Sequence, residues 1–290
     1  MPGARSGSEE PRHHESGPGP EVRTGTPLSA LTVANVRDLG GIPLVHAGAD
    51  RVVAPGLLLR SGALDRFDPA GDTGITGLGI RTVVDLRTDE ERGAAPDVLP
   101  RGAGLVTADV LGAARRSAPA RLGSLLADPA AAGRELGGGR VEEVFAAAYR
   151  EMVLSPGACA AYRTLVEATA DERRRPLLFH CSAGKDRTGW GATVVLLLLG
   201  ADRATARAAH LAVNPAVRAA FAPYVSAFTA RGGDPRIAAA VTEVLPGYLA
   251  AALDAVDTEW GGFDRYVTHG LGLDRRTVDR LRTALVAPAP

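Results

Sequence analysis

The chain has 290 residues, enough for one large domain or two small ones. Hydrophobic residues make up 46% and charged residues 23%, as in ordinary globular proteins, and the formal net charge is zero, so no overall field favours nucleic acid or an anionic membrane. Aromatic residues make up only 4%, too few for the stacking surfaces that bind single-stranded nucleic acid. We therefore expect no nucleic-acid partner.

Residues 1–25 are expected to form a disordered tail, because Gly, Ser, Pro, Arg and Glu occur there without hydrophobic periodicity. The tail has no apolar core of the kind that a secretory signal needs. No later segment reaches the ~18 uncharged apolar residues of a membrane span, so we expect no integral membrane segment. We assign residues 26–290 to one folded domain. The cytoplasm is its default location, and export without a signal peptide stays open.

The first part of this domain has the pattern of short strands joined by turns. Residues 35–41 combine Arg37 and Asp38 with a Gly-Gly break, and this pair either braces a turn near an anion or forms a structural ion pair. Strand-like runs follow at residues 51–53 and 57–60, separated by the turn signal Ala-Pro-Gly. Residues 105–109 are expected to add a further strand.

A second landmark is the β-branched, buried strand at residues 82–87, which ends in the charged residues Asp85 and Arg87. Charges at the carboxyl end of a buried strand in an α/β sheet usually face the ligand crevice. A purely structural ion pair between the two is the alternative. Residues 90–92, Glu-Glu-Arg, have the pattern of a solvated helix start.

Helical patterns dominate the rest of the chain. Residues 112–139 are rich in Ala, Gly, Pro and Arg and have no clear period. Asn214 and Pro215 are expected to cap and begin a helix that runs to residue 230. The expected helices are residues 141–154, 158–170, 204–213, 214–230, 236–245, 247–258 and 277–286. We therefore predict an α/β fold, in which helices flank a central sheet and form a cover in the C-terminal half.

The stretch that concentrates chemistry is residues 179–189, Phe-His-Cys-Ser-Ala-Gly-Lys-Asp-Arg-Thr-Gly. An apolar strand precedes it, and an apolar helix follows at residues 190–199. A small-residue loop between a strand and a helix points backbone N–H groups inward, at the positive end of the helix dipole, so that an anion fits there. Cys181 stands at the mouth of this cradle. The other cysteine, Cys159, is expected to be an inert, buried residue.

The spacing of Cys181 and Arg187 suits phosphoryl transfer. A thiolate is a strong nucleophile toward phosphorus, and inward N–H groups, a helix N-terminus and a guanidinium all favour the anion of a thiol, whose ordinary pKa is about 8.5. Arginine grips two phosphate oxygens at once and matches the charge of the transition state. His180 is expected to orient the nucleophile, and Thr188 to donate its hydroxyl to the sulfur. The residues expected to bind the substrate phosphate are Ser182, Ala183, Gly184, Lys185, Thr188 and Gly189.

Lys185 is the only lysine in the chain, where every other basic side chain apart from histidine is arginine. A compact ammonium kept inside a phosphate loop is expected to contact the ligand. A nucleotide-binding Walker loop is excluded, because Asp186 follows the Gly-Lys pair and residue 180 is histidine.

The loop sequence HCSAGKDRTG at residues 180–189 resembles the signature of cysteine-dependent protein tyrosine phosphatases, in particular a bacterial branch typified by a secreted mycobacterial phosphatase with tyrosine, serine/threonine and phosphoinositide substrates. Further blocks that resemble the family in the same order are residues 35–41, 60–61, 84–87, 247–249 and 262–266. The resemblance extends over roughly residues 31–286.

The resemblance implies that Cys181 forms a phosphocysteine, that Arg187 binds the phosphate, and that no metal or other cofactor takes part. It implies that Asp186 is the general acid. Asp85 is the rival candidate for this role, and it matches a family aspartate that instead orients the loop arginine. Arg37 and Arg87 are supporting residues, and a lid is implied at about residues 204–245. The substrate is then a phosphoprotein carrying phosphotyrosine, with phosphoserine or phosphothreonine as further possibilities.

Two alternatives remain open from the sequence. Lys185 resembles a loop lysine of phosphatases that accept inositol lipids, which favours a phosphoinositide phosphatase. A phosphate-binding pseudo-phosphatase without turnover is the other, although the presence of Cys181, Asp186 and Arg187 gives it no support. A rhodanese or arsenate reductase would be expected to have a different loop composition or further reactive cysteines.

Overall fold

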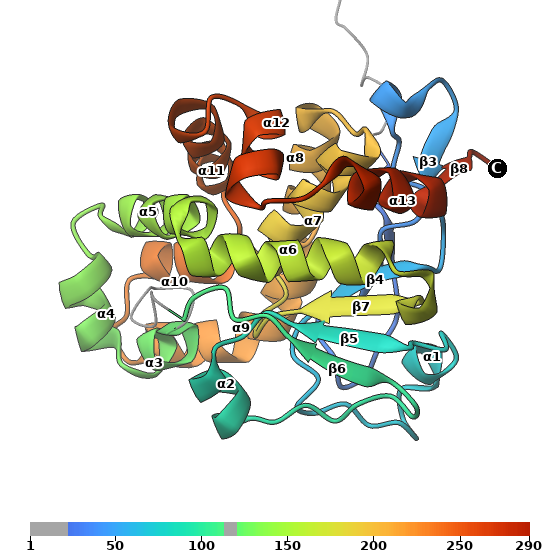
Figure 1. The fold of residues 1–290 in the computed structure, drawn as a ribbon. Coiled ribbons are helices and arrows are strands. Elements are labelled where there is room, and N and C mark those ends of the chain that lie inside the picture. Colours follow the sequence, from blue (N-terminus) through green and yellow to red (C-terminus); the bar gives the residue numbers. More distant parts are fainter. Residues whose placement is uncertain (1–22, 113–120) are drawn as a thin grey trace, which may run out of the picture.

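The computed structural model describes residues 23–112 and 121–290, and its core is a mixed six-stranded sheet (Figure 1). The strand order is β1-β2-β4-β7-β5-β6. The strands are β1 (Thr26–Pro27), β2 (Arg37–Asp38), β4 (Leu58–Ser61), β5 (Thr82–Asp85), β6 (Gly104–Thr107) and β7 (Leu177–His180). The predicted α/β fold with a central sheet is therefore confirmed, and the predicted tail at residues 1–25 lies almost wholly outside the described residues.

Strand β7 lies at the centre of the sheet, and all four of its residues are buried. It runs parallel to both neighbours, with Phe179 opposite Arg60 of β4 and opposite Val84 of β5. Because parallel strands end at the same edge of a sheet, the residues that follow β4, β5 and β7 meet at one edge. The predicted loop after β7 is therefore brought next to the ends of strands that lie about 100 residues earlier in the sequence.

Strand β3 (Arg51–Val53) does not join the central sheet. It pairs with β8 (Val286–Pro288) in a separate two-stranded antiparallel sheet, with Val52 opposite Ala287. The pairing ties the end of the chain to its first part. The sequence pattern alone gave no signal for a strand at residues 286–288, since a short apolar run after a helix fits either state.

Most helices pack on one face of the sheet and form the largest hydrophobic core with it (Figure 1). The other face, with Leu59, Val83 and Leu178, belongs to a second, smaller cluster that includes Ile75 of α1. Helix α5 matches its predicted bounds, and α6 begins two residues before its predicted start because Ser155 caps it and Pro156 opens it. The α-helices of the described residues are α1 (Thr73–Thr76), α2 (Asp89–Ala94), α3 (Leu122–Ala127), α4 (Pro129–Leu136), α5 (Val141–Leu154), α6 (Pro156–Ala170), α7 (Asp186–Leu199), α8 (Arg203–Leu211), α9 (Asn214–Ala230), α10 (Pro235–Thr242), α11 (Pro246–Glu259), α12 (Phe263–Arg265) and α13 (Arg275–Leu285), with shorter turns at η1 (Val45–Ala47), η3 (Glu172–Arg174) and η4 (Tyr266–Gly270).

Helices α8, α9 and α10 occupy the segment predicted to be a lid, and Asn214 has a different role from the expected one. Asn214 lies inside α9, and no side-chain cap is formed at that helix end. Its amide donates to the Val244 carbonyl and accepts from the Val244 N–H, at 3.0 and 2.9 Å. The predicted cap is thus wrong. The side chain instead clamps the start of α9 to the segment that follows α10.

Residues 121–136, which had no readable sequence pattern, form α3 and α4 beside α9 and α10 (Figure 1).

Within the described residues, no single helix is long and apolar enough to cross a membrane. The pair α10 and α11 would qualify by length and composition together, but it is bent by 50°.

Candidate active site

The loop predicted to bind phosphate runs from Cys181 at the end of β7 to the first turn of α7. The Cys181 side chain lies in a nearly closed position, with 3% of its surface exposed. Ser182 is exposed, whereas the following loop residues are buried. The strand–loop–helix arrangement expected from the sequence is therefore present, and the nucleophile candidate lies beneath the surface of the molecule.

Gly184 shapes the loop. Its φ is +66°, and a Cβ at this position would lie 2.3 Å from the Ser61 carbonyl oxygen, so only glycine fits. The Gly184 carbonyl accepts hydrogen bonds from Asn35 Nδ2 at 2.8 Å and from Arg60 Nη2 at 2.7 Å. The blocks at residues 35 and 60, which resemble the phosphatase family, thus both contact the loop and fix its backbone through the Gly184 carbonyl.

Arg187 forms a two-pronged ion pair with Glu91, in which Nη1 and Nη2 donate to the two carboxylate oxygens at 2.6 and 2.7 Å. Glu91 is held by a capping box with Thr88 at the start of α2. Burial raises the pKa of Glu91, but the hydrogen bonds and charge of Arg187 outweigh this effect and lower it to about 2. The predicted solvated helix start at residues 90–92 is therefore wrong for Glu91, because Arg187 draws its carboxylate inward.

The pairing leaves the Nε donor of Arg187 unused. Its Nε is buried and has no hydrogen-bond partner among the described residues. A buried donor without a partner costs free energy unless an acceptor arrives. Glu91 thus fixes the guanidinium on its Nη side, and the Nε side keeps a donor for an oxyanion.

Asp186 lies in a buried cluster of polar groups on the other side of the loop. Its Oδ1 accepts from the Tyr149 hydroxyl at 2.9 Å, and Lys185 Nζ lies 3.1 Å from Oδ1 and 2.9 Å from Oδ2. Lys185 Nζ also donates to the Glu243 carbonyl at 3.3 Å and lies 5.0 Å from the centre of the Phe145 ring. Lys185, expected to face the ligand, is thus paired with Asp186 and only 1% exposed.

Asp85 and Arg87 form the structural ion pair that the sequence left open as an alternative. Arg87 Nε and Nη2 donate to the Asp85 carboxylate at 3.0 to 3.1 and 2.8 Å, and both side chains are almost fully buried. Arg87 Nη2 also lies 2.8 Å from Asp97 Oδ1. Asp85 therefore points toward Arg87, and no hydrogen bond joins it to Arg187.

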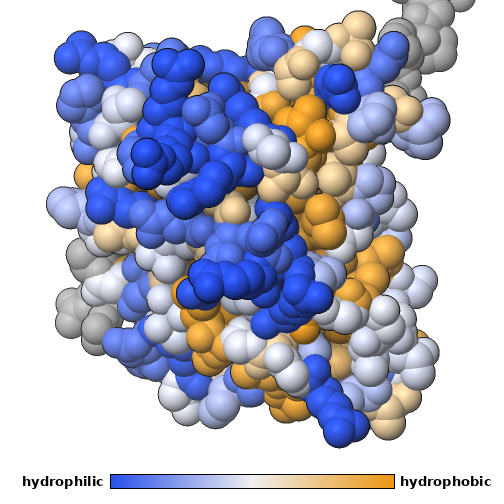
Figure 2. Space-filling view, turned by 45° about the vertical axis from the view of Figure 1, so that its right-hand side comes forward, coloured by the Kyte–Doolittle hydropathy of each residue, from blue (hydrophilic) through white to orange (hydrophobic). Residues whose placement is uncertain are grey.

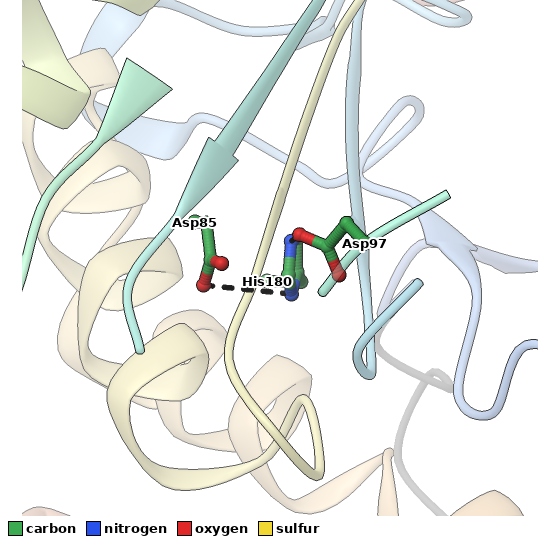
Figure 3. A group of neighbouring side chains, drawn as sticks. All are labelled: Asp85, Asp97 and His180. Atoms are coloured by element: carbon green, nitrogen blue, oxygen red, sulfur yellow. Dashed lines mark ion pairs between the residues drawn. The ribbon is translucent and has the colours of Figure 1, made fainter. Parts of the chain in front are cut away.

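His180 lies between Asp85 and Asp97 (Figure 3). Its Nε2 is 3.0 Å from Asp97 Oδ2, and its Nδ1 is 4.0 Å from Asp85 Oδ1 and 3.2 Å from the Cys181 carbonyl oxygen. Three such groups within 4.8 Å of one another have the spacing of metal ligands. Arg87, however, bridges both carboxylates and supplies the positive charge, so we interpret the cluster as a buried ion-pair network that fixes the residue before Cys181.

Arg37 and Asp38, predicted either to brace a turn near an anion or to pair with each other, contact separate partners. Arg37 Nη2 donates to the Ala212 carbonyl at 2.8 Å, between α8 and α9. Asp38 accepts from the backbone N–H groups of Gly40 and Gly56, at 2.8 and 2.7 Å. The alternative of an ion pair between the two is therefore wrong: Arg37 braces the lid segment, and Asp38 braces two turns.

Thr188 and Gly189 lie in the first turn of α7. The Thr188 hydroxyl is buried and has no partner among the described residues, so the expected bond to the Cys181 sulfur is not formed. A Cβ on Gly189 would lie 2.5 Å from the imidazole of His210. Gly189 therefore makes room for His210 of α8. Cys159 is buried as expected, and burial raises the pKa of its thiol to about 11.

One hollow lies away from this loop. It is a groove of about 1220 Å³ between the end of α6 and α13, on the side that Figure 2 brings forward, where hydrophilic residues gather. Arginine side chains of the η3 segment and of α13 line it together with carboxylates, and no residue of the loop does. We therefore locate the candidate active site by its chemistry and its contacts.

The sequence is similar to those of known phosphatases along most of its length. A sequence model described as the tyrosine phosphatase family matches residues 28–287. A protein of Cupriavidus necator that carries the name tyrosine-protein phosphatase is 29% identical over 257 residues, which cover 85% of each chain. The triple specificity protein phosphatase PtpB of Mycobacterium tuberculosis is 33% identical over 287 residues, which cover 87% of this chain and 99% of the relative.

Replacing Glu91 by Gln is expected to destabilise the fold by roughly 3 kcal/mol at neutral pH, because Arg187 would keep a buried charge without its partner. Since the pKa of Glu91 is lowered to about 2 in the folded state, its contribution is complete above its ordinary pKa of 4.5 and is lost as the pH falls toward 2. Urea unfolding of both proteins over this pH range measures the difference.

The exposed neighbour Glu90 offers a matched control, and Glu90→Gln is expected to change the free energy of unfolding by less than about 0.5 kcal/mol. A difference between Glu91→Gln and wild type that stayed constant from neutral pH to pH 2 would contradict the assigned ion pair.

Proposed function

Because this chain belongs to the tyrosine phosphatase family, we propose that it hydrolyses phosphotyrosine in proteins, and phosphoserine and phosphothreonine more slowly, through a phosphocysteine intermediate. Membership makes it a protein phosphatase, an enzyme that hydrolyses phosphoric monoesters. The observation that carries the proposed mechanism is the loop itself: a cysteine at its base, and an arginine whose Nη side is fixed by Glu91 while its Nε keeps a free donor.

In the first step the Cys181 thiolate attacks phosphorus, so that the S–P bond forms as the P–O bond to the leaving group breaks. Arg187 and the backbone N–H groups of the loop hold the non-bridging oxygens and stabilise the charge that spreads over them. The leaving oxygen takes a proton from Asp186. The products of this step are the dephosphorylated hydroxyl compound and a phosphocysteine on the enzyme.

In the second step a water molecule attacks the phosphorus of the phosphocysteine. Asp186, now a carboxylate, takes one proton from that water, and the S–P bond breaks. Inorganic phosphate leaves and the Cys181 thiolate is regenerated, so the two steps balance without an oxidant or reductant.

We assign the proton donor to Asp186 rather than Asp85. Asp186 stands in the loop five residues after Cys181, whereas the Asp85 carboxylate is enclosed by the Arg87 guanidinium and the Arg87 backbone N–H. Asp85 thus points toward Arg87 and lies outside the loop that contains Cys181. Asp85 instead acts on the site indirectly, through the network around His180.

A protein substrate is preferred over the two alternatives. The phosphoinositide alternative depended on Lys185 as a free cation, and the pairing of Lys185 with Asp186 removes that support. The pseudo-phosphatase alternative lacks any support, since Cys181, Asp186 and Arg187 are all present. The name of the mycobacterial relative gives it triple specificity, which is the reason to propose a substrate range wider than phosphotyrosine.

Replacing Cys181 by Ser is expected to lower turnover of an aryl phosphate by several orders of magnitude, because a serine hydroxyl in this loop is a far weaker nucleophile. Cys159→Ser is the matched control and should retain activity, since the Cys159 thiol is buried and donates to the Val153 carbonyl. Acid quenching of wild type with radiolabelled substrate should trap phosphate on Cys181. Equal rates for Cys181→Ser and wild type would overturn the mechanism.

Replacing Asp186 by Asn is expected to slow substrates with poor leaving groups by roughly 10²-fold or more, and those with good leaving groups much less. The measurement is kcat/KM over a series of aryl phosphates whose phenols differ in pKa. Asp85→Asn is expected to lower stability without this dependence on the leaving group. If Asp85→Asn alone showed the dependence, the proton donor would be Asp85.

Replacing Lys185 by Met, which keeps the length of the side chain, is expected to reduce turnover of a phosphotyrosine peptide and of a soluble phosphoinositide by the same factor. The reason is that Lys185 acts on Asp186, which serves every substrate alike. Parallel assays of wild type and variant decide the point. A loss at least tenfold larger for the phosphoinositide would restore the lipid alternative.

A further inference from the structure

We propose that Tyr149 and His210 are positioning residues that orient the carboxyl group of Asp186 for proton transfer. The inference rests on the proposed function, because it gives Asp186 the role of proton donor. It concerns two residues of other elements, Tyr149 of α5 and His210 of α8, which the sequence did not single out.

The three side chains form a continuous buried chain of polar contacts. Tyr149 Oη lies 2.9 Å from Asp186 Oδ1 and 3.2 Å from His210 Nε2. The Tyr149 and His210 rings meet edge to face, with centroids 5.9 Å apart. Tyr149 is fully buried, and His210 and Asp186 are 2% and 4% exposed. Water is thus kept from the hydrogen bonds, which is the setting in which polar networks are strongest.

The protonation states of Tyr149 and His210 bear on the direction of donation in this chain. Burial, and then the nearby charge of Asp186, raise the pKa of Tyr149 well above its ordinary value of 10, so the phenol keeps its proton and donates it to Oδ1. Burial, and then the charges of Arg60 and Lys185, lower the pKa of His210 to about 3, so the imidazole is neutral. With the phenol proton directed to Asp186, the His210 tautomer that carries its proton on Nε2 completes the chain by donating to the phenol oxygen.

This polarity determines which oxygen of Asp186 carries a proton. In a protonated carboxyl group one oxygen bears the proton and the other accepts hydrogen bonds. Tyr149 donates to Oδ1, and so Oδ1 is the accepting oxygen. The transferable proton is therefore directed to Oδ2. The Lys185 ammonium contacts both oxygens of Asp186. When Oδ2 is protonated, the ammonium still has two acceptors, which are Oδ1 and the Glu243 carbonyl.

The position of His210 is set by α7 itself. The imidazole packs against Gly189, where a Cβ would lie 2.5 Å from the ring. Gly189, which is expected to bind the substrate phosphate, therefore also leaves space for His210 next to the loop. Through this contact α8, the first helix of the segment expected to form the lid, reaches the proton donor by way of Tyr149.

Tyr248 of α11 provides a control for packing alone. It is 1% exposed and stacks on Phe145 at 5.1 Å, and its ring lies 5.6 Å from that of Tyr149. Its hydroxyl donates to the Ala240 carbonyl at 3.1 Å, and no hydrogen bond joins it to Asp186. Tyr149→Phe and Tyr248→Phe thus each remove one buried phenol oxygen from the same aromatic cluster.

The test compares kcat/KM of wild type, Tyr149→Phe and Tyr248→Phe over aryl phosphates whose leaving phenols range from strongly to weakly acidic. Tyr149→Phe should lose roughly tenfold or more with the poorest leaving group and little with the best, which gives a steeper dependence on leaving-group pKa. Tyr248→Phe should give a line parallel to wild type. Equal slopes for Tyr149→Phe and wild type would overturn the proposal.

Two variants of His210 complete the design. His210→Gln keeps an N–H donor and should restore a slope near that of wild type, whereas His210→Leu should behave as Tyr149→Phe. If Tyr149→Phe does not fold, as judged by thermal unfolding, His210→Leu carries the test with Tyr149 intact. A wild type that hydrolysed no aryl phosphate would instead refute the proposed function, so the two failures are distinguishable.

Discussion

The constraint on which this structure depends is that the loop buries three consecutive charges. Lys185, Asp186 and Arg187 are 1%, 4% and 1% exposed, and each ion taken out of water costs several kcal/mol unless it is paired. The loop cannot satisfy them alone, because only the first two neutralise each other. The third requires Glu91, which lies 96 residues earlier in the sequence. The fold therefore has to bring the start of α2 to the end of β7.

The parallel order of the sheet meets this requirement. Because β5 and β7 are neighbours with Asp85 opposite His180, the segment that follows β5 begins beside the loop. Thr88 then caps α2 and turns Glu91 back toward Arg187. On the other flank β4 brings Arg60 to the Gly184 carbonyl. The carboxyl ends of the strands thus position the residues of the site, as in other α/β sheets whose ligands bind beyond these ends.

The sequence predicts well what depends on local pattern. The bounds of α5, the strand before Cys181 and the helix after it follow from periodicity and from flanking glycines and prolines. Side-chain partners across the sheet do not follow from pattern. Glu91 is an ordinary member of the run Glu-Glu-Arg, Tyr149 is one apolar-face residue of an amphipathic helix, and His210 is a lone histidine. The only local signal was the capping pair of Thr88 and Glu91, which explains the helix start but not the inward turn of the carboxylate.

The two acidic residues near the loop have different roles: Glu91 stays charged, whereas Asp186 is proposed to transfer a proton. Glu91 faces two donors of a guanidinium, and its lowered pKa keeps it ionised throughout the physiological range, so it fixes Arg187 and exchanges no proton. Asp186 is contacted by a phenol and an ammonium, of which the phenol is neutral and donates to Oδ1. A residue that must alternate between acid and carboxylate needs a partner that holds it in both states. Tyr149 meets that need because its single proton can be offered to Oδ1 whether or not Oδ2 is protonated.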